Sequence, residues 1–482
     1  MTDKQRLQAN NVALQEIKEQ LAKITISIGE KKQEVEIELP AVFASANEFY
    51  YMQITDDRIL MSANANNCGL WMYTISAKSI SQLYTSELSW QYFQQVSDTK
   101  WLIGCYGSSE AGLLLYNSEH NTCERIYTTG AQWRYFTQVS NNKWLIAGGS
   151  NSHGILLYNS EDDSVVQIYS VYNSHSWSNV KQVSNTKYLI SASYTYSDLC
   201  RGILLYNSKD DSCVKIYDVS YNWKYFQQVS DTKWLIGANR SSTGILLYNS
   251  EDDNITQIYT IGGWWQSFLQ VSDTKYLISS QDYSNGILVY NSGNDSIVQI
   301  YTTGRSFIYS QQVTNTKWLI ASNSGSFYGI LVYNSEDDTC ELKYSQGYDW
   351  MYYTQVSNTK WLISSASSNT GGILLYNSED DSIVQIFSNS GEWKYVQQVN
   401  ANKWLLSSSA SGSSGYGVLL YNLENNNISQ IAFKGGYNYD IFTPDVDNNY
   451  YISGSNKITT PRTLYYTEST DTVTLVGYYL EV

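Results

Sequence analysis

Proline and charge are both scarce in this chain. It has 3 Pro among 482 residues, and only 16% of its residues are charged. A collagen-like chain needs far more Pro together with periodic Gly, so that class is excluded. A disordered chain would lack the aromatic residues, which here make up 15% of the total and include 44 Tyr and 15 Trp. The composition therefore indicates a folded protein rich in aromatic residues.

Long apolar runs and an excess of positive charge are also lacking. No apolar run approaches the ~18 residues of a membrane span, and the polar start of the sequence predicts that there is no secretory signal peptide. The formal net charge is −15, and a chain this acidic cannot neutralise nucleic-acid phosphates broadly. We therefore expect neither membrane insertion nor a nucleic-acid partner.

Residues typical of catalytic and metal sites are few and scattered. The 3 His lie at non-equivalent places without a fixed acidic or nucleophilic neighbour. The 6 Cys form no Cys-x-x-Cys pair and no disulfide framework. The recurring Glu-Asp-Asp turns do not have the spacing of a calcium-binding EF-hand loop. We predict no enzyme, no metal and no cofactor, although a carboxylate pair for glycoside hydrolysis, formed only in space, stays open.

An internal repeat dominates the sequence. The phrase Gln-Val-Ser-Asp-Thr-Lys-Trp-Leu-Ile recurs with small changes, which gives ten tandem units of about 43 residues. The first residue of the phrase falls at Gln95, Gln138, Gln182, Gln228, Gln270, Gln312, Gln355 and Gln398, with degenerate copies at Gln53 and Pro444. A fixed period of this length is typical of solenoids, propellers and arrays.

Each unit contains four strand-like pieces separated by Gly, Asn, Asp and Ser. In the fifth unit they span 223–229, 233–238, 244–249 and 254–259. Four short strands per unit are typical of a propeller blade. We predict an all-β fold, a β-propeller of about ten four-stranded blades over residues 47–482. One large ring is favoured, and two smaller rings or an open array remain as alternatives.

The leader differs from the repeats. The pattern of residues 1–24 predicts a helix that begins with a capping box formed by Thr2 and Gln5. Two rows of residues at heptad spacing predict a coiled coil that forms a homo-oligomer, and we take a trimer as the working guess. The rows consist of Leu7, Asn10, Leu14, Ile17, Leu21 and Ile24. The alternative is an amphipathic helix packed on the body. Residues 25–46 are expected to form a β-hairpin connector, with strands at 25–28 and 34–39.

The leader also carries a resemblance. Its opening, Met-Thr-Asp-Lys-Gln-Arg-Leu-Gln-Ala-Asn-Asn, resembles the start of tail-fibre and receptor-binding proteins of phages that infect gut Firmicutes. The resemblance covers the leader alone. It implies a segment attached to a virion, followed by a body that recognises the host. The location it implies is a virion tail or an extracellular particle.

Comparing the repeats with one another separates two kinds of connection. The turn between the first and second strands (97–99, 184–186, 357–359) and the turn between the third and fourth (159–163, 249–253, 377–381) are nearly constant. The other connections vary in length and carry Tyr, Trp, Ser, Gly and Asn, as antibody loops do. Because a meander alternates its connections between two faces, we predict one regular face and one recognition face. Drift in unconstrained loops is the alternative.

Aromatic residues in or beside the variable connections are the predicted ligand contacts. They are Trp264, Trp265, Tyr194, Tyr196, Tyr172, Tyr106, Tyr283, Tyr328, Trp133, Trp223, Trp350 and Trp393. For the tryptophans at the entry to the first strand, packing between blades is the alternative role. Trp264 has no counterpart in the other repeats. The tryptophans of the second strand, such as Trp101 and Trp234, are predicted to be blade core.

These observations predict a non-enzymatic receptor-binding or adhesion protein. Its aromatic loops would contact a ligand on a host surface, with a cell-surface glycan as the first choice and avidity adding several weak sites. One alternative is a propeller that serves as a scaffold for protein partners. A less favoured alternative is a glycan-cleaving enzyme with its site in a central channel.

Overall fold

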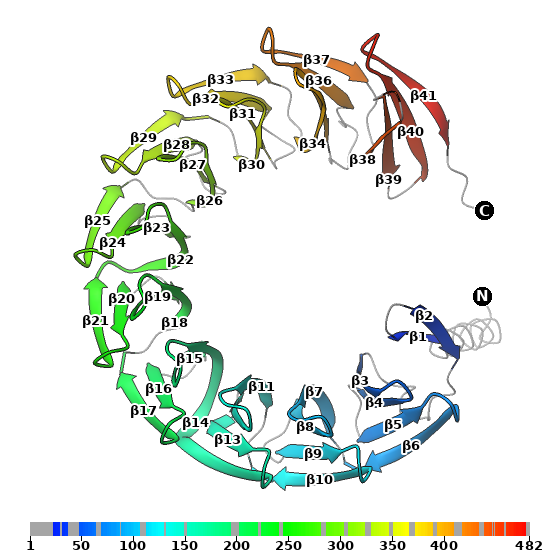
Figure 1. Cartoon of the computed structure of the whole chain (residues 1–482), viewed down its shortest axis with the longest axis vertical. Helices are drawn as coiled ribbons and strands as arrows, with labels where there is room; N and C mark the ends of the chain where they lie inside the picture. Colours follow the sequence, from blue (N-terminus) through cyan, green and yellow to red (C-terminus); the bar gives the residue numbers. More distant parts are fainter. Residues whose placement is uncertain are drawn as a thin grey trace, which may run out of the picture. The chain divides into compact units, whose positions relative to one another are not determined.

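The computed structural model contains strands and turns, and no helix, in the part of the chain that it describes (Figure 1). The described residues are 23–28, 31–36, 48–63, 69–86, 88–106, 112–129, 132–148, 152–193, 202–219, 223–240, 244–280, 286–302, 307–322, 329–346, 350–365, 372–388, 393–408, 417–432, 438–445, 447, 449–456 and 459–478. The predicted leader helix, with Leu7, Asn10, Leu14, Ile17 and Leu21, lies outside them.

A β-hairpin precedes the repeats. Strands β1 (Lys23–Ile28) and β2 (Lys31–Glu36) pair antiparallel, with Ile24 opposite Val35. The hairpin is confirmed, but the prediction for Ile24 was wrong, because this residue lies in a strand and not in a helical seam. From Ile24 to Ile28 apolar and polar residues alternate, and this strand period with β-branched side chains outweighs the heptad spacing.

Ten four-stranded antiparallel meanders, blades 1 to 10, follow along the described residues. The first five use β3 (Phe49–Thr55), β4 (Arg58–Ala63), β5 (Leu70–Thr74), β6 (Ser79–Tyr84); β7 (Ser89–Gln95), β8 (Lys100–Tyr106), β9 (Leu113–Asn117), β10 (Thr122–Tyr127); β11 (Trp133–Gln138), β12 (Lys143–Gly148), β13 (Ser152–Asn159), β14 (Ser164–Gln182); β14 again, β15 (Lys187–Ser193), β16 (Ile203–Asn207), β17 (Ser212–Tyr217); and β18 (Trp223–Gln228), β19 (Lys233–Arg240), β20 (Ile245–Asn249), β21 (Asn254–Tyr259).

Blades 6 to 10 repeat the plan. They use β22 (Gly263–Gln270), β23 (Lys275–Ser280), β24 (Ile287–Asn291), β25 (Ser296–Tyr301); β26 (Phe307–Gln312), β27 (Lys317–Ser322), β28 (Ile330–Asn334), β29 (Thr339–Tyr344); β30 (Trp350–Gln355), β31 (Lys360–Ser365), β32 (Ile373–Asn377), β33 (Ser382–Phe387); β34 (Trp393–Asn400), β35 (Lys403–Ser408), β36 (Val418–Asn422), β37 (Asn427–Ala432); and β38 (Asn438–Pro444), β39 (Tyr450–Asn456), β40 (Thr459–Thr467), β41 (Thr472–Tyr478). The all-β fold of repeated propeller-type blades is confirmed.

The chain divides into two compact units, and the boundary between them runs through blade 5. Unit 1 contains blades 1 to 4 with part of blade 5, and unit 2 contains the rest of blade 5 with blades 6 to 10. The contacts below are given within each unit.

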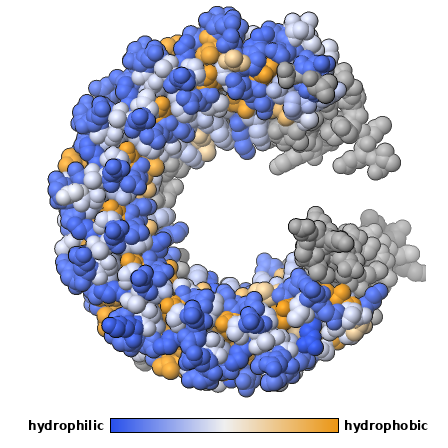
Figure 2. Space-filling view, in the orientation of Figure 1, coloured by the Kyte–Doolittle hydropathy of each residue, from blue (hydrophilic) through white to orange (hydrophobic). Residues whose placement is uncertain are grey.

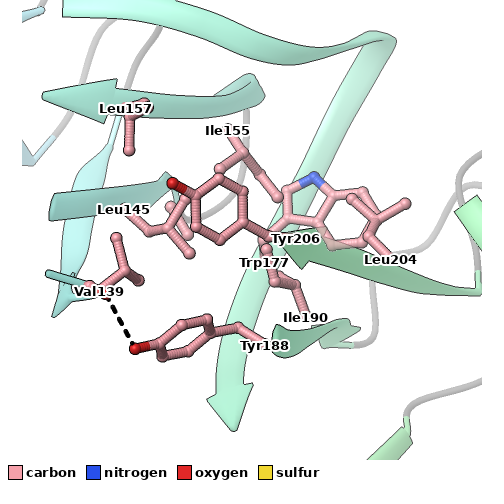
Figure 3. Close-up of a cluster of buried hydrophobic side chains, with 10 residues drawn as sticks. Val139, Leu145, Ile155, Leu157, Trp177, Tyr188, Ile190, Leu204 and Tyr206 are labelled. Atoms are coloured by element: carbon pink, nitrogen blue, oxygen red, sulfur yellow. Dashed lines mark hydrogen bonds between the residues drawn. The ribbon is translucent and has the colours of Figure 1, made fainter. Parts of the chain in front are cut away.

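The hydrophobic core lies between successive blades. Figure 3 shows the cluster between blades 3 and 4, where Trp177 is 1% exposed and packs among side chains of both blades, including Ile155 and Ile190. The hydroxyl of Tyr188 donates a hydrogen bond to the carbonyl of Val139 in the preceding blade, at 3.1 Å. Neither blade could bury its face alone, so stacking supplies most of the apolar burial that stabilises each sheet.

The two constant turns of each blade lie side by side. In blade 2 the amide of Ser118 donates to the carbonyl of Thr99 at 2.8 Å, and the same bond joins Ser160 to Asn142 in blade 3. The prediction that these turns share one face is confirmed by such bonds. The repeated Gln side chains contact their own turns, as when Gln138 donates to the Asn141 carbonyl, and they are exposed.

A lysine begins the second strand of blades 2 to 9. In six of these blades its ammonium pairs with an aspartate that closes the next blade's second constant turn. Within the units these pairs are Lys100–Asp163, Lys143–Asp211, Lys187–Asp253, Lys275–Asp338, Lys317–Asp381 and Lys403–Asp471. Each of these aspartates has a positive φ, and each accepts a hydrogen bond from a tyrosine of its own third strand, as Asp163 does from Tyr158 at 2.7 Å.

Candidate ligand-binding site

The tryptophans at the entry to the first strands are buried. Trp133, Trp223, Trp265, Trp350 and Trp393 are all 0% exposed. Trp133 meets Tyr127 of the preceding blade edge to face, with ring centroids 5.8 Å apart, and its indole N–H donates to the carbonyl of Thr129. A ligand cannot stack on a ring that is covered in this way. The structure therefore gives these five residues the packing role that was their alternative, because the cores between blades need one large ring each.

Trp264 behaves differently from its neighbour Trp265. It is 37% exposed, and its backbone pairs with Asn239, so the start of β22 joins blade 6 to the end of β19. Trp264 thus combines a paired backbone with a side chain that is accessible to solvent. Trp264 is thus the predicted contact whose described environment suits a ligand best.

The predicted tyrosine contacts cannot be placed as side chains. Tyr106 ends β8 and Tyr172 lies within β14, and the backbone alone is described for both. Tyr194, Tyr196, Tyr283 and Tyr328 lie outside the described residues. The recognition role of the variable connections therefore stays a prediction.

A β-bulge interrupts the first strand of nearly every blade directly after the buried ring. In β7 the register shifts between Trp90 and Tyr92, and in β11 it shifts between Trp133 and Tyr135. A bulge leaves one residue unpaired and turns its side chain out of the regular alternation. In the blades whose side chain is described at this place, that residue is Gln91, Arg134, Met351 or Lys394. The bulge thus places a variable side chain beside a constant core residue.

Two of these bulges open into one hollow in unit 1. The hollow has a volume of about 560 Å³ and lies along the first strands of blades 1 to 3, with one residue from blade 4. Its aromatic and polar lining consists of Tyr51, Gln91, Tyr92, Gln94, Arg134, Tyr135 and Thr137. A hollow of this size accommodates a small ligand or a few sugar residues.

The rest of the lining ties the hollow to the cores. Met52 and Phe93 pack against the core between blades 1 and 2, Phe136 against the next core, and Val180 against the one after it. Side chains anchored in this way move little. The hollow is therefore supported by the same packing that joins the blades.

The chemistry of the hollow combines ring faces with amides and one cation. Tyr51 is 52% exposed, so its ring can contact a ligand directly. The amide nitrogens of Gln91 and Gln94 donate to Ser89 Oγ and the Gln95 carbonyl, which fixes their direction. The guanidinium carbon of Arg134 lies 4.8 Å from the centroid of the Tyr135 ring. Such a contact between a guanidinium and a ring face is favourable.

Sequence reasoning missed this hollow because it assigned ligand recognition to the variable connections and not to the first strands. The repeat does contain a sequence pattern that could have indicated this site. In blades 2 to 6, 8 and 9 the residue after the tryptophan at the entry to the first strand is Gln, Arg, Ser, Lys or Met, whereas the position before it is Trp in all seven. Variation at one fixed place inside a strand is the pattern that a bulge facing solvent produces.

Two further features complete the survey of the described residues. Among them, no three His, Cys, Asp or Glu side chains are grouped so as to hold a metal ion. A helix long and apolar enough to cross a membrane does not occur in that part of the chain either.

No protein-family model matches the chain, and no curated protein matches it. Several solved structures are similar. The extracellular domain of a protein assigned as a hybrid two-component system of B. thetaiotaomicron is 11% identical, with a TM-score of 0.26, over 95% of this chain and 69% of that one. Dihydro-heme d1 dehydrogenase NirN is 11% identical, with a TM-score of 0.33, over 78% and 79%. The Dos1 propeller is 12% identical, with a TM-score of 0.31, over 65% and 88%. These values carry no statement about function.

Proposed function

We propose that the chain is a non-enzymatic adhesion or receptor-binding protein whose ligand is a cell-surface glycan. The observation that supports this most is the hollow on the first strands, where the exposed ring of Tyr51 and the half-buried rings of Tyr92 and Tyr135 lie beside hydrogen-bonded amides. Ring faces stack on the C–H faces of sugars, and amides with a guanidinium bond their hydroxyls. Trp264, exposed on unit 2, supplies a second aromatic contact of the same kind.

The distribution of hydrophobic residues on the surface supports a polar ligand. On the face that Figure 2 presents, hydrophobic residues are dispersed among hydrophilic ones. Large exposed apolar patches mark protein or membrane interaction sites, whereas a glycan ligand does not need one. Weak individual sites would add if several chains acted together.

A glycan array tests the proposal, followed by binding of labelled protein to candidate host cells before and after removal of surface polysaccharide. We expect binding to a subset of glycans, and cell binding that falls when the polysaccharide is removed. Binding that persists unchanged on stripped cells would contradict a glycan ligand. Release of reducing sugar from bound glycan would show an enzyme instead.

A scaffold for protein partners is the second candidate, and one repeated feature favours it. The outer strand of several blades exposes a valine at the same position, namely Val166, Val214, Val298 and Val384, with exposures of 50% to 58%. Apolar side chains along an edge strand suit pairing with another chain. A stable protein that co-purifies, together with an array that shows no glycan binding, would favour this function.

The leader extends the proposal. The heptad rows that begin at Leu7 and Asn10 would join copies of the chain, with a trimer as the working guess, or attach them to a larger particle such as a virion tail. Oligomerisation would bring several hollows to one surface. A solution mass measurement tests this, because a monomer would exclude the coiled coil.

A further inference from the structure

We infer that blade 10 is a cap, which blocks the stacking of a second copy of the chain on the C-terminal end of the repeats. The face that blade 10 turns away from blade 9 is its end face, and it is built to stay in solvent. This inference is independent of the proposed glycan-binding function. It follows from comparing the residues that each blade presents to the blade after it.

Blades 2, 3 and 5 to 9 each present four apolar side chains to the following blade. In blade 9 these are Val399, Leu405, Val418 and Leu420, which are at most 9% exposed and pack against blade 10. The same four places hold Val, Leu or Ile in the earlier blades, where they form the cores described above. A blade of this kind needs a neighbour to cover its apolar face.

Blade 10 departs from this pattern at all four places. The pairing of β39 with β40 puts Tyr451 opposite Tyr465, just as the pairing of β35 with β36 puts Leu405 opposite Leu420. Tyr451 is 41% exposed, whereas Leu405 is 0% exposed. In this register the places of the four apolar residues of blade 9 are taken by the end-face residues Asp445, Tyr451, Thr463 and Tyr465.

The end face makes polar contacts of its own. The hydroxyl of Tyr465 donates a hydrogen bond to the carboxylate of Asp445, and the ring centroids of Tyr451 and Tyr465 lie 4.9 Å apart. Asp445 also accepts hydrogen bonds from the backbone amides of Asp447 and Asn449, both at 2.9 Å. An apolar surface laid on this face would remove water from the carboxylate without offering a donor in return, which is unfavourable.

The lysine that joins one blade to the next is also missing from blade 10. Its place before β39 is taken by Asn449. The amide nitrogen of Asn449 donates to Asp445 at 3.2 Å, and its amide oxygen accepts from the backbone of Glu468 at 3.0 Å. Asp471 of blade 10 pairs with Lys403 of blade 9. Blade 10 therefore accepts a lysine from the blade before it and offers none to a blade after it.

These substitutions have a consequence for assembly. A terminal repeat with an apolar outer face would recruit other molecules, and an end-to-end contact that does not close on itself can continue into fibres. The polar end face removes this risk at the C-terminal end of the repeats. A homo-oligomer of the chain would accordingly use another surface.

The first test restores the apolar residues of the other blades. Asp445→Val, Tyr451→Leu and Tyr465→Leu are combined in the full chain, and circular dichroism checks that the variant folds. Light scattering then compares its mass in solution with that of wild type over a range of concentrations. We expect the variant to reach about twice the mass of wild type or more, because its end face is now an apolar patch.

A matched control adds apolar side chains elsewhere. Thr256, Ser429 and Thr474 are exposed on outer strands, at the position where other blades carry an exposed valine. Combining Thr256→Val, Ser429→Val and Thr474→Val should leave the mass equal to that of wild type. A folded end-face variant that keeps the mass of wild type overturns the inference. An equal increase in the control also overturns it, because apolar surface at any place would then suffice.

A second measurement does not depend on whether the end-face variant folds. Tyr451→Cys is treated with a bulky maleimide in the native state, with Leu405→Cys in the equivalent place of blade 9 as its control. We expect Tyr451→Cys to gain one label relative to wild type and Leu405→Cys to gain none until the protein is unfolded. Protection of the cysteine in native Tyr451→Cys overturns the inference, because the end face would then be covered.

Discussion

The ammonium nitrogen of Lys100 lies 2.7 Å from a carboxylate oxygen of Asp163, which belongs to the following blade. The same carboxylate accepts a hydrogen bond from Tyr158 at 2.7 Å, and Lys100 also donates to the carbonyl of Ser160 at 3.2 Å. Asp163 adopts a φ of 58°, a left-handed conformation that Asp and Asn tolerate better than most residues. One side chain thus closes its own turn and joins two blades.

Substitutions of Asp163 should therefore lower the free energy of unfolding by different amounts, depending on which of these contacts they remove. Asp163→Asn keeps an acceptor for Tyr158 and tolerates the backbone, so it should lower the free energy of unfolding by about 1 kcal/mol or less. Asp163→Ala loses both bonds and adds backbone strain, and should cost about 2 to 3 kcal/mol. Urea unfolding followed by tryptophan fluorescence measures both.

Two controls separate backbone from side chain. Asp163→Gly removes the same bonds without the strain, so it should be less harmful than Asp163→Ala by about 1 kcal/mol. Asn426 naturally takes the Asp place opposite Lys360 and bonds it at 2.9 Å. Asn426→Asp should accordingly stabilise slightly. Equal stability of all these variants would show that the pair between blades contributes nothing.

Blade 7 lacks the buried tryptophan that lies at or near the start of the first strand in blades 3, 5, 6, 8 and 9. Phe307 stands in its place and lines a small void of about 20 Å³ with Leu269, Leu277 and Ile320. Phe307→Trp should fill this void and raise the free energy of unfolding by about 0.5 to 1 kcal/mol, because cavity filling adds apolar contacts. Thermal unfolding measures the change, and a lower midpoint would show that the core cannot accept the larger ring.

The reverse substitution gives the matched measurement. Trp350 is 0% exposed and its indole N–H donates to the carbonyl of Gln346 at 3.1 Å. Trp350→Phe removes that bond and part of the ring, and should cost about 2 kcal/mol. A tolerated Trp350→Phe would mean that the cores are loosely packed.

Gly154 lies in the third strand of blade 3, at a point where the outer strand comes close. Gly154 has a φ of 141°, and a Cβ there would lie 1.8 Å from the carbonyl oxygen of Tyr169. Gly154→Ala should therefore lower the free energy of unfolding by about 3 kcal/mol, since backbone must move. Gly293→Ala is the control, because a Cβ there meets only the Asn291 side chain, at 3.2 Å. Similar small effects for both would contradict the close approach.

Buried thiols and phenols predict how stability depends on pH. Burial raises the pKa of the Cys105 and Cys213 thiols to about 12, and burial together with the hydrogen bond to Asp163 raises the pKa of Tyr158. The folded state thus keeps protons that the unfolded state releases. The stabilisation is complete below about pH 9 and is lost as pH rises toward about 12.

Urea unfolding across that range tests the sign. We expect equal stability at about pH 7 and 8 and a progressive loss by about pH 10.5. The thiols of the native protein should also resist iodoacetamide at about pH 8 and react only after unfolding. Stability that rises above pH 9, or rapid alkylation of Cys105 in the native state, would be inconsistent with these burial effects.

Much of the fold could be predicted because the repeat is local and frequent. In blade 5 the predicted pieces at 233–238 and 254–259 fall on β19 and β21, whose observed bounds are Lys233–Arg240 and Asn254–Tyr259. Period, β-branched residues and turn residues all lie within one unit of sequence. They specify strands without any information on how blades pack.

The features that the sequence did not predict depend on contacts between blades. Nothing near Lys100 in the sequence indicates Asp163, because the two meet only when blades stack. The burial of Trp133 and the outward turn of Arg134 both follow from a bulge, which strict alternation does not anticipate. The site prediction therefore selected aromatic residues that serve the core and missed the hollow beside them.

The central claim is that the hollow on the first strands binds glycan. The most direct measurement is the affinity of Tyr51→Ala for a glycan that wild type binds, with Tyr451→Ala as the control, since these rings are 52% and 41% exposed and only the first lines the hollow. The account predicts about a tenfold loss for Tyr51→Ala and no change for Tyr451→Ala. Full affinity in Tyr51→Ala, or an equal loss in both variants, would contradict it.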